Sequence, residues 1–570
     1  MSVEPVKVQN QSTNVAHVES NNGISPRRNI LDISYCMEPT FNISYLETHL
    51  SNHPDKEFVN KLLNSAKYGV DIGYTGPRNY RESKNWPSAY KYKEAVRKSI
   101  TKDVERGRKL GPFSHPPFEA FIGSPMGAFP KKRSDKYRII HDLSWPPQNS
   151  VNDYISKEDF SVKYITIDQP LARVVKYGSG TLMSKLDLAD AFKHILVRQR
   201  DWELLGSVWE DTDSAGNKVK EYYVDTVLPF GLRSSPKLFN DFAEALQFIM
   251  EKQGVSDVDH YLDDYFTCGP PNSNICRSNL DTMLAVCDEF GFEVNPSKTE
   301  CPTTCLELLG IIIDSELMQV RISKERLKDC ADELNEWQNR KICTKRQLLS
   351  LIGRLMFVSR VVRSGRTFVR RLIELSKKVK HLHYKVKLNK DAQQDILWWI
   401  KYLPNWNGIS VIPDQKCISN IQLQLWTDAS DVGYGAYFDG EWIQERFIGE
   451  KKQLAMKSIN WRELYAIVKA AATWGHLFVG KSVCFHCDNM SIVNILQKGT
   501  SKCPCIMKLV RALFYIGAKY DFVCTAVFIR GTSNGIADAL SRFENSRFRD
   551  LAPNAQILMT VPGQIDIIDC

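Results

Sequence analysis

The sequence lacks any long apolar segment. Across its 570 residues, no hydrophobic run approaches the roughly 18 to 20 residues that a membrane-spanning helix needs, and the N-terminal end lacks the apolar core of a secretory signal. We therefore expect an intracellular chain with no membrane partner, in the cytoplasm or the nucleus. With 43% hydrophobic, 11% aromatic and 25% charged residues, collagen-like and wholly disordered classes are also excluded.

Cysteine is not in excess, and no zinc pattern with regular spacing is present. The nearest candidates among the 15 cysteines are Cys484 and Cys487, followed by Cys503 and Cys505. The second pair is one residue too tight for a zinc site. The first pair lies in a strand-like run, where its spacing would send the two side chains to opposite faces. We therefore expect all of the cysteines to be free thiols.

The chain is several times longer than one folding unit of roughly 100 to 200 residues, so several cores are expected. It shows no internal repeat. Strand-like and helical periodicities alternate along it, which predicts an α+β multidomain protein. The expected segments are a disordered tail (1–40), an N-terminal helical extension (41–111), a strand and helix region (112–315), a mainly helical region (316–420), a second strand and helix region (421–545) and a C-terminal tail (546–570).

Positive charge is concentrated in one block. The formal net charge is +9, but residues 340–390 alone hold 16 Lys or Arg against one acid, Glu374. Within this block, Thr344 and Gln347 have the spacing of a capping box, and apolar residues follow at helical spacing. A basic helix face suits contact with a polyanion such as nucleic acid. The alternative is a solvated helix face with no partner.

A first group of acids lies in the strand and helix region. Asp187 ends a strand-like run and is expected at an exposed strand terminus. Asp263 and Asp264 follow Tyr261 and Leu262 between two β-prone runs, so they are expected at the tip of a hairpin. Neighbouring carboxylates repel each other, and a polymerase-type site exploits this by neutralising them with divalent cations.

Two further segments accompany these acids. Residues 228–236, with the sequence LPFGLRSSP, lead into a helix for which Ser235 is the expected N-cap and Pro236 the first helical residue. In the same segment, Gly231 would let the backbone come close to a nucleotide or template. Residues 130–143 are typical of a basic β-hairpin able to hold a triphosphate.

Residues 124–310 resemble a reverse transcriptase, because motifs of that family occur here in the family's order. The motifs are the basic hairpin, Asp187 with Phe192, the LPFG segment, the YLDD tetrapeptide 261–264, the run from Gly291 to Lys298, and Leu308-Leu309-Gly310. The resemblance implies a right-hand polymerase, with fingers and palm in residues 112–315 and thumb and connection in residues 316–420.

By this resemblance Asp187, Asp263 and Asp264 hold two Mg²⁺, with Mn²⁺ as a substitute. One cation activates the primer 3′ hydroxyl and the other neutralises the leaving pyrophosphate. Phe192 matches the side chain that clashes with a ribose 2′ hydroxyl; the alternative is an aromatic of the palm core. Ser144 stands where many relatives carry an arginine. The residues expected to bind the nucleotide are Lys131, Arg138, Phe192, Phe230, Gly231 and Lys298, the last of which could instead be merely solvated.

A second group of acids lies on four separate predicted elements near the C-terminus. Asp428 ends a strand, Glu463 lies in a helix, Asp488 follows another strand, and Asp538 lies in a later helix. The dipeptide Asp439-Gly440 joins two of three predicted antiparallel strands. The four acids are 35, 25 and 50 residues apart along the chain, so only folding can bring them together.

This order of elements and acids resembles ribonuclease H of the retroelement type over residues 421–543. The resemblance implies an α/β ribonuclease H-like domain that binds two Mg²⁺ and cleaves RNA paired to DNA. Its acids are Asp428, Glu463, Asp488 and Asp538. Relatives often carry a histidine ten residues before the last acid, where this chain has Phe528. The basic block, lying between the two sites, is then expected to contact the duplex.

We therefore expect an RNA-directed DNA polymerase with ribonuclease H activity from a retrotransposon, most similar to DIRS-type elements and next to gypsy-type elements. The expected partners are an RNA template, a DNA primer, the RNA/DNA hybrid and deoxynucleoside triphosphates. Protease, zinc-knuckle and integrase motifs are not recognisable, so those activities would come from other retroelement proteins or be missing. Two alternatives are a domesticated, non-catalytic nucleic-acid-binding protein that keeps the fold, and a polymerase devoted to DNA templates.

Overall fold

A computed structural model describes most of the chain, and its contacts define two compact units that interleave along the sequence. The first unit includes residues 67–156 and 196–232, and the second includes residues 41–66, 157–195 and the chain from Arg233 onward. The predicted N-terminal tail lies outside the described residues. The described ranges are 40–130, 137–212, 216–405, 409–411, 423–479, 481–520 and 522–557.

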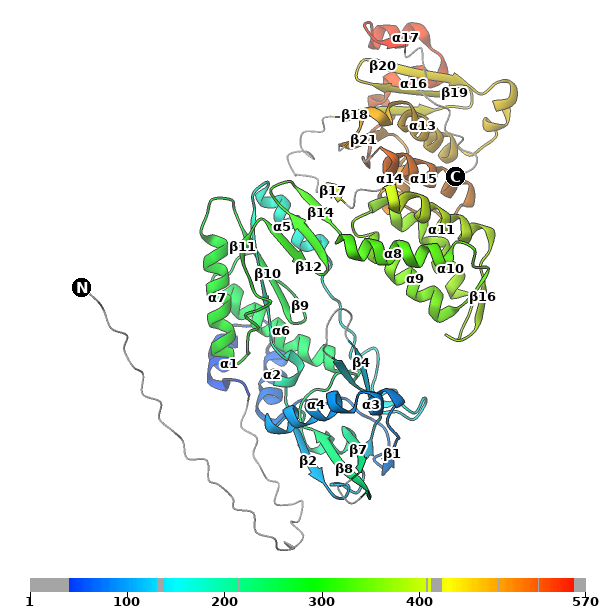
Figure 1. Cartoon of the computed structure of the whole chain (residues 1–570). Coiled ribbons are helices and arrows are strands. Elements are labelled where there is room, and N and C mark those ends of the chain that lie inside the picture. The colour runs from blue at the N-terminus through cyan, green and yellow to red at the C-terminus, as the bar shows by residue number, and fades with distance from the viewer. Residues whose placement is uncertain are drawn as a thin grey trace, which may run out of the picture. The chain divides into compact units, whose positions relative to one another are not determined.

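The first unit is built on a five-stranded sheet of order β1-β3-β7-β8-β2, with a separate β4–β5 hairpin. In Figure 1 its helices α3 and α4 lie beside this sheet. The hairpin pairs Met126 with His141 and Pro130 with Tyr137, so a hairpin forms here as predicted, but it begins at Met126 and its basic residues 131–136 lie outside the described residues. The elements are β1 (Arg81–Glu82), α3 (Pro87–Lys91), α4 (Lys93–Glu105), β2 (Lys109–Phe113), β3 (Ile122–Gly123), β4 (Met126–Pro130), β5 (Tyr137–His141), η2 (Val151–Tyr154), η4 (Gln199–Leu204), β7 (Gly206–Thr212) and β8 (Lys218–Asp225).

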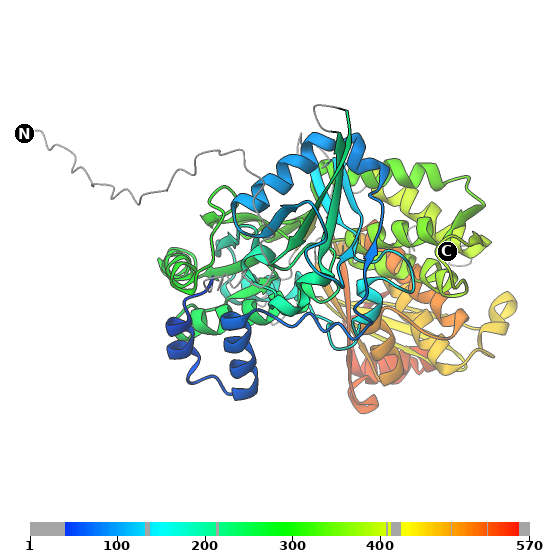
Figure 2. The ribbon, with the colours of Figure 1, turned by 90° about the horizontal axis from the view of Figure 1, so that it is seen from below.

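The second unit begins with two short helices, α1 and α2, which lie side by side in Figures 1 and 2. Its first sheet has four strands in the order β11-β6-β10-β9. Helices α6 and α7 pack on one face of this sheet, and α5 packs against β10. The elements are α1 (Ile43–Leu50), α2 (Lys56–Tyr68), α5 (Asp168–Tyr177), β6 (Leu182–Asp187), η3 (Ala191–His194), α6 (Ser235–Lys252), β9 (Asp259–Tyr261), β10 (Asp264–Gly269), α7 (Ile275–Phe290) and β11 (Glu300–Thr303).

Helix α6 confirms the predicted helix but begins one residue early. Ser235 is its first residue and Ser234 its N-cap, with no side-chain capping bond, so the assignment of Ser235 as N-cap was wrong. Pro236 is tolerated at the second position because N–H groups of the first turn have no partner within the helix. The predicted apolar face is buried at Phe239 and Phe242.

The next part of the second unit is mainly helical, as predicted. The capping box is present: the Thr344 N–H donates to Gln347 Oε1 at 2.9 Å, and the Gln347 N–H donates to Thr344 Oγ1 at 3.2 Å. A short β15–β16 pair was not predicted. The elements are β12 (Cys305–Leu308), β13 (Ile311–Asp314), β14 (Gln319–Arg321), α8 (Lys324–Trp337), β15 (Ile342–Thr344), α9 (Lys345–Val358), η5 (Arg363–Phe368), α10 (Arg370–Lys377), β16 (Lys385–Lys387), α11 (Lys390–Tyr402), η6 (Leu403–Asn405) and β17 (Ile409–Val411).

The C-terminal sheet of the second unit has the strand order β22-β21-β18-β19-β20-β23. Its first three strands along the chain are antiparallel neighbours. Asp439 and Gly440 have φ values of 48° and 82°, which confirms the predicted two-residue hairpin. The elements are β18 (Leu423–Ala429), β19 (Gly433–Phe438), β20 (Glu441–Arg446), η7 (Gly449–Leu454), α13 (Ile459–Trp474), η8 (Gly475–Leu477), β21 (Ser482–Cys487), α14 (Met490–Lys498), α15 (Pro504–Lys519), β22 (Val523–Phe528), η9 (Gly531–Ser533), α16 (Gly535–Arg542), α17 (Asn545–Leu551) and β23 (Gln556–Ile557).

Folded structure continues into the segment predicted as a C-terminal tail. Phe548 of α17 is buried against Trp442, and β23 pairs in parallel with β20.

The α+β multidomain class is confirmed. Every cysteine within the described ranges is a free thiol. None of the helices in these ranges has both the length and the hydropathy of a membrane span.

Candidate active sites

The fold brings the three acids of the first group together. Strand β6 ends at Asp187, and Asp264, the first residue of β10, is its direct antiparallel partner. Asp263 lies in the turn between β9 and β10, after Leu262, whose φ is 55°. The Leu188 N–H donates to the Asp263 carbonyl at 3.0 Å. A hairpin turn and the end of the neighbouring strand therefore meet at one edge of the sheet.

Asp187 is buried, with 3% of its surface exposed, so the expectation of an exposed strand terminus was wrong. The physical reason is a later segment that crosses the end of β6. The Asn295 N–H donates to the Asp187 carbonyl at 2.8 Å, and the Ala189 N–H donates to the Glu293 carbonyl at 2.7 Å. This covering contact joins residues more than 100 positions apart, which periodicity cannot indicate.

Negative charge is only partly balanced in this group. Lys298 donates to Asp187 Oδ1 and Oδ2 at 2.9 and 3.0 Å, and these bonds raise the pKa of Lys298. Burial, followed by the charge of Asp263, raises the pKa of Asp264 to about 6. Burial, followed by the charge of Asp187, also raises the pKa of Asp263. A divalent cation would relieve this repulsion.

The predicted nucleotide-binding residues lie in both units. Lys298 contacts Asp187, and Phe192 is half-buried with its ring 5.3 Å from that of Phe239, both in the second unit. Arg138 and Phe230 are exposed side chains of the first unit. Lys131 lies outside the described residues.

Gly231 makes its close approach to the protein itself. Its φ is +112°, and a Cβ placed there would lie 2.3 Å from the carbonyl oxygen of His141 on β5. The Asn152 side chain donates to the Gly231 carbonyl at 2.8 Å. Only glycine therefore fits between this loop and strand β5.

A buried charged network beneath this loop was not predicted. Lys109 contacts Asp225 at 2.8 Å, and His141 Nδ1 contacts the other oxygen of Asp225 at 3.0 Å. His141 Nε2 lies 3.0 Å from the Gly206 carbonyl. Burial alone would raise the pKa of Asp225, but Lys109 and His141 lower it. No local sequence signal links these positions, because each lies on a different strand or strand end.

The second group of acids also converges. Asp428 lies near the end of β18, and Asp488 directly follows β21. These strands are parallel, with Trp426 opposite His486, so their carboxyl ends meet at one edge of the sheet. Helix α13 brings Glu463 to this edge and α16 brings Asp538. Asp428 and Glu463 are buried, with exposures of 5% and 4%.

Side chains from α16 and α17 hold two of these acids. Ser541 donates from Oγ to Asp428 Oδ2. Arg542 Nε and Arg547 Nη1 contact the two carboxylate oxygens of Asp538 at 2.6 and 2.7 Å. These partners were not predicted, although Ser541 and Arg542 follow Asp538 by three and four residues in a predicted helix, where side chains share a face.

The same acids differ in how easily they ionise. Burial, followed by the charges of Asp428 and Asp488, raises the pKa of Glu463 to about 9. Burial, with smaller effects of Asp488 and Asp538 against the Ser541 hydrogen bond, raises the pKa of Asp428 to about 6. Burial would also raise the pKa of Asp538, but its bonds to the two arginines lower it.

Three neighbouring groups of this cluster could hold a cation. Ligand atoms of Glu463, Cys487 and Asp488 lie within 4.8 Å of one another. Burial raises the pKa of the Cys487 thiol, so it stays neutral and is a poor ligand for a hard cation. Within the part of the chain that the structure describes, Glu463 Oε2 is buried without a hydrogen-bond partner. Carboxylate oxygens, which Mg²⁺ prefers, are therefore available at this edge.

Comparison with known families gives the class of the first site. Residues 129–313 match the family described as "Reverse transcriptase (RNA-dependent DNA polymerase)". This match spans Asp187, Asp263 and Asp264, together with strands β6, β9 and β10. The chain therefore carries a reverse transcriptase domain.

Two curated relatives are viral polyproteins. Polyprotein P3 of Commelina yellow mottle virus is 23% identical over 435 residues, which cover 73% of this chain and 20% of that protein. The putative enzymatic polyprotein of Cassava vein mosaic virus is 23% identical over 466 residues, covering 75% and 63%. The chain thus spans from one fifth to less than two thirds of these relatives. The predicted relationship to retroelement reverse transcriptases is confirmed, whereas neither the DIRS-type nor the gypsy-type assignment is tested.

Solved structures with a similar course of the chain include two of a foamy viral protease-reverse transcriptase. The structure of the foamy viral protease-reverse transcriptase dRH in complex with double-stranded DNA has a TM-score of 0.46 and 16% identity, covering 85% of this chain and 81% of that one. The structure in complex with an RNA/DNA hybrid has a TM-score of 0.43 and 15% identity, covering 85% and 62%.

Proposed function

We propose that the chain is an RNA-directed DNA polymerase with a C-terminal ribonuclease H activity. The observation that carries the proposal is the meeting of distant acids at two sites. Asp264 pairs directly with Asp187 in one sheet, and Asp428 and Asp488 end neighbouring parallel strands in another. Both sites consist of carboxylates whose mutual repulsion a divalent cation would relieve.

At the first site, Asp187, Asp263 and Asp264 would hold two Mg²⁺, or Mn²⁺ in their place. When bound, these cations activate the primer 3′ hydroxyl and stabilise the charge on the leaving pyrophosphate. Lys298, which contacts Asp187, supplies a positive charge next to these oxygens. Its release from Asp187 would leave the ammonium group available to the triphosphate.

The remaining nucleotide contacts are part of the proposal. Phe192 would exclude a ribose 2′ hydroxyl and so favour deoxynucleotides. Arg138 of β5 would contact the triphosphate, as would Lys131, while Phe230 and Gly231 would contact the nucleotide. The close approach of Gly231 to the His141 carbonyl supports this assignment, because it fixes the backbone next to the exposed Phe230 ring.

At the second site, Asp428, Glu463, Asp488 and Asp538 would hold two Mg²⁺ for cleavage of RNA paired to DNA. When bound, the cations activate a water molecule and stabilise the leaving 3′ oxygen. Ser541 orients the Asp428 carboxylate through its hydrogen bond. Arg542 and Arg547 keep Asp538 ionised by lowering its pKa.

The basic block 340–390 would bind the duplex that joins the two activities. Ten of its 16 basic residues lie on α9, η5, α10 and β16, in the second unit. Phosphate contacts of this kind bind without regard to sequence and weaken as salt rises. We propose the domain boundaries accordingly: fingers and palm over 112–315, thumb and connection over 316–420, and ribonuclease H over 421–545.

Primer extension tests the polymerase. Wild type and Asp263→Asn are given a DNA primer on an RNA template, deoxynucleotides and Mg²⁺. Incorporation by wild type and its loss in the variant are expected. Equal incorporation by both proteins, or none by wild type, contradicts the proposal and favours a nucleic-acid-binding protein without turnover. A parallel reaction on a DNA template distinguishes a polymerase that prefers DNA.

Hybrid cleavage tests the nuclease. A labelled RNA strand paired with DNA is incubated with wild type and with Asp428→Asn. Fragments are expected only from wild type. Asp263→Asn serves as the matched control, since it removes an acid of the other site and should cleave normally. Cleavage that survives in Asp428→Asn contradicts the assignment.

A further inference from the structure

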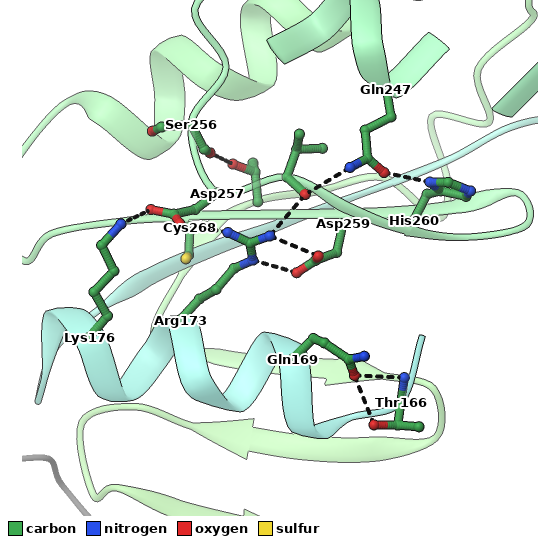
Figure 3. A network of polar contacts seen from close by, with 12 residues as sticks. Thr166, Gln169, Arg173, Lys176, Gln247, Ser256, Asp257, Asp259, His260 and Cys268 are labelled. Carbon is green, nitrogen blue, oxygen red and sulfur yellow. Dashed lines mark hydrogen bonds and ion pairs between the residues drawn. The ribbon is translucent and has the colours of Figure 1, made fainter. Parts of the chain in front are cut away.

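The segment that contains α5 contacts both the strand that leads to the YLDD turn and the bend just before that strand. Arg173 of α5 contacts Asp257 and Asp259, and the ring of Tyr164, just before α5, lies 4.9 Å from that of Tyr261. Alternate residues of an extended strand point to the same face. Asp259 and Tyr261 are alternate residues of β9, so the segment containing α5 contacts one face of this strand at both of its ends, as Figure 3 shows for Arg173 and Asp259. Asp257, with a φ of 52°, lies in the bend before β9.

Arg173 provides the strongest of these contacts. Its Nη2 donates to Asp259 Oδ1 at 2.8 Å while its Nε donates to Oδ2 of the same carboxylate. Its Nη1 contacts Asp257 Oδ1 at 2.6 Å. Lys176 and Tyr177 of the same helix also contact Asp257. The bidentate fork fixes the direction of the Asp259 side chain as well as its charge.

The opposite face of β9 is held by α6. His260 Nδ1 contacts Gln247 Oε1, and Gln247 Nε2 points to the Val258 carbonyl at 3.4 Å (Figure 3). Burial lowers the pKa of His260 to about 4, so this contact is neutral at physiological pH. Charge on β9 is therefore concentrated on the α5 side.

The contacts of Arg173 with Asp257 and Asp259 lie close to the catalytic acids but do not involve them. Strand pairing places Tyr261 opposite Asp264 and Asp259 opposite Phe266, so Asp259 lies two residues along the strand, or roughly 7 Å, from the row of Asp264 and Asp187. β9 forms the edge of its sheet and pairs over three residues only. A short edge strand is easily displaced. In this protein β9 leads into the turn on which Asp263 and Asp264 repel each other.

We propose that Arg173 is a positioning residue of the polymerase site: by binding Asp259 and Asp257 it holds β9 in place, so that Asp263 and Asp264 meet Asp187 at the spacing that cations need. The proposal rests on the proposed polymerase function. Partners that orient metal-binding carboxylates typically change cation affinity by about 10- to 100-fold when removed. The expected defect is therefore in cation use.

The test is primer extension across a range of Mg²⁺ concentrations. Arg173→Gln should raise the Mg²⁺ concentration for half-maximal rate by about tenfold or more, with the KM for deoxynucleotide at saturating Mg²⁺ changed much less. Arg173→Lys keeps the positive charge but cannot make the bidentate contact with Asp259, so its Mg²⁺ requirement should lie between those of wild type and Arg173→Gln. Arg277→Gln is the matched control, because Arg277 forms an exposed ion pair with Asp281 on α7 of the same unit. An unchanged Mg²⁺ requirement in Arg173→Gln overturns the proposal.

A double-mutant cycle separates positioning from general loss of stability. Asp259→Asn should reproduce the Mg²⁺ defect, and the double variant Arg173→Gln/Asp259→Asn should be no worse than either single variant, since both remove one bond. Fully additive defects overturn the proposal. If Arg173→Gln fails to fold, the double variant, which has one unpaired carboxylate fewer, and Arg173→Lys carry the test.

Cation binding gives a readout that needs no turnover. Mn²⁺ is titrated into protein whose second site is disabled by Asp428→Asn and Asp488→Asn, and free Mn²⁺ is followed by its electron paramagnetic resonance signal. Weaker binding after Arg173→Gln is expected, and equal binding overturns the positioning role. Absence of primer extension by wild type overturns the polymerase function instead, so the two failures are distinguishable.

Discussion

Lys298 donates hydrogen bonds to both carboxylate oxygens of Asp187, at 2.9 and 3.0 Å. A cation that uses Asp187 must therefore displace an ammonium group from the same oxygens. Lys298 is 59% exposed at its side chain, so water can take over its solvation when it leaves. The lysine and a cation bound at this site would compete for one ligand.

The first prediction follows from this competition. Lys298→Gln should bind Mn²⁺ about 2- to 5-fold more tightly in the absence of nucleotide, as expected from loss of a partly exposed ion pair worth up to ~1 kcal/mol. Electron paramagnetic resonance on protein with the second site disabled measures this. Lys237→Gln is the control, because Lys237 pairs with Asp241 on α6. Weaker binding by Lys298→Gln would show that the lysine assists the cation instead.

The second prediction concerns Asp264, whose pKa is raised to about 6 by burial and by Asp263. A carboxyl group whose pKa is higher in the folded than in the unfolded protein lowers the free energy of unfolding as pH rises. The loss runs from about pH 4, near the ordinary pKa of a carboxyl group, to about pH 6. Without divalent cations, Asp264→Asn should raise the midpoint of thermal unfolding by roughly 2 to 4 °C at pH 8. The gain should vanish near pH 4. Asp281→Asn is the exposed control, and a gain that persists at pH 4 contradicts this origin.

The third prediction concerns Glu463, whose pKa is raised to about 9 mainly by burial. At pH 7 the group is protonated, and a cation binds its ionised form, so binding should release about one proton per site. Affinity should rise as pH increases from 7 to 9. Calorimetry in buffers of different ionisation enthalpy measures the released proton, in protein with Asp263→Asn and Asp264→Asn. The Glu463→Gln variant should lose the dependence of the binding enthalpy on the buffer. A binding enthalpy that does not depend on the buffer in the protein that keeps Glu463 contradicts the prediction.

The fourth prediction concerns Ser541, which is fully buried and donates to Asp428. Ser541→Ala removes a hydrogen bond to an ionised group and leaves the carboxylate less fixed, so the kcat of hybrid cleavage should fall by about tenfold or more. Primer extension by the same protein should be unchanged. Ser546→Ala, an exposed serine of α17, is the matched control. Equal cleavage by Ser541→Ala and wild type rules out this role.

Local signals in the sequence predicted much of the fold. The Thr344 capping box and the Asp439-Gly440 turn both formed as expected, because each depends on residues within a few positions. The apolar spacing of α6 predicted its buried face, and the error at Ser235 was one residue. Local chemistry of this kind is contained within the element itself.

Contacts between distant segments could not be predicted in the same way. The burial of Asp187 depends on the segment around Asn295. The contacts that hold β9 depend on Arg173, which lies more than 80 residues before Asp257. No periodicity links these positions. The acids themselves were named from family motifs, and the structure brings Asp264 beside Asp187. Their catalytic roles stay predictions until the variants are measured.

The order of strands in the β11-β6-β10-β9 sheet has a consequence for synthesis. Strand β6 lies in the interior of the sheet, yet its partners β10 and β11 are 77 and more residues further along the chain. While the ribosome translates that interval, both edges of β6 are open to other nascent chains. Slowing elongation between β6 and β11 should therefore lower the yield of folded protein, and chaperones that cover extended segments should restore it.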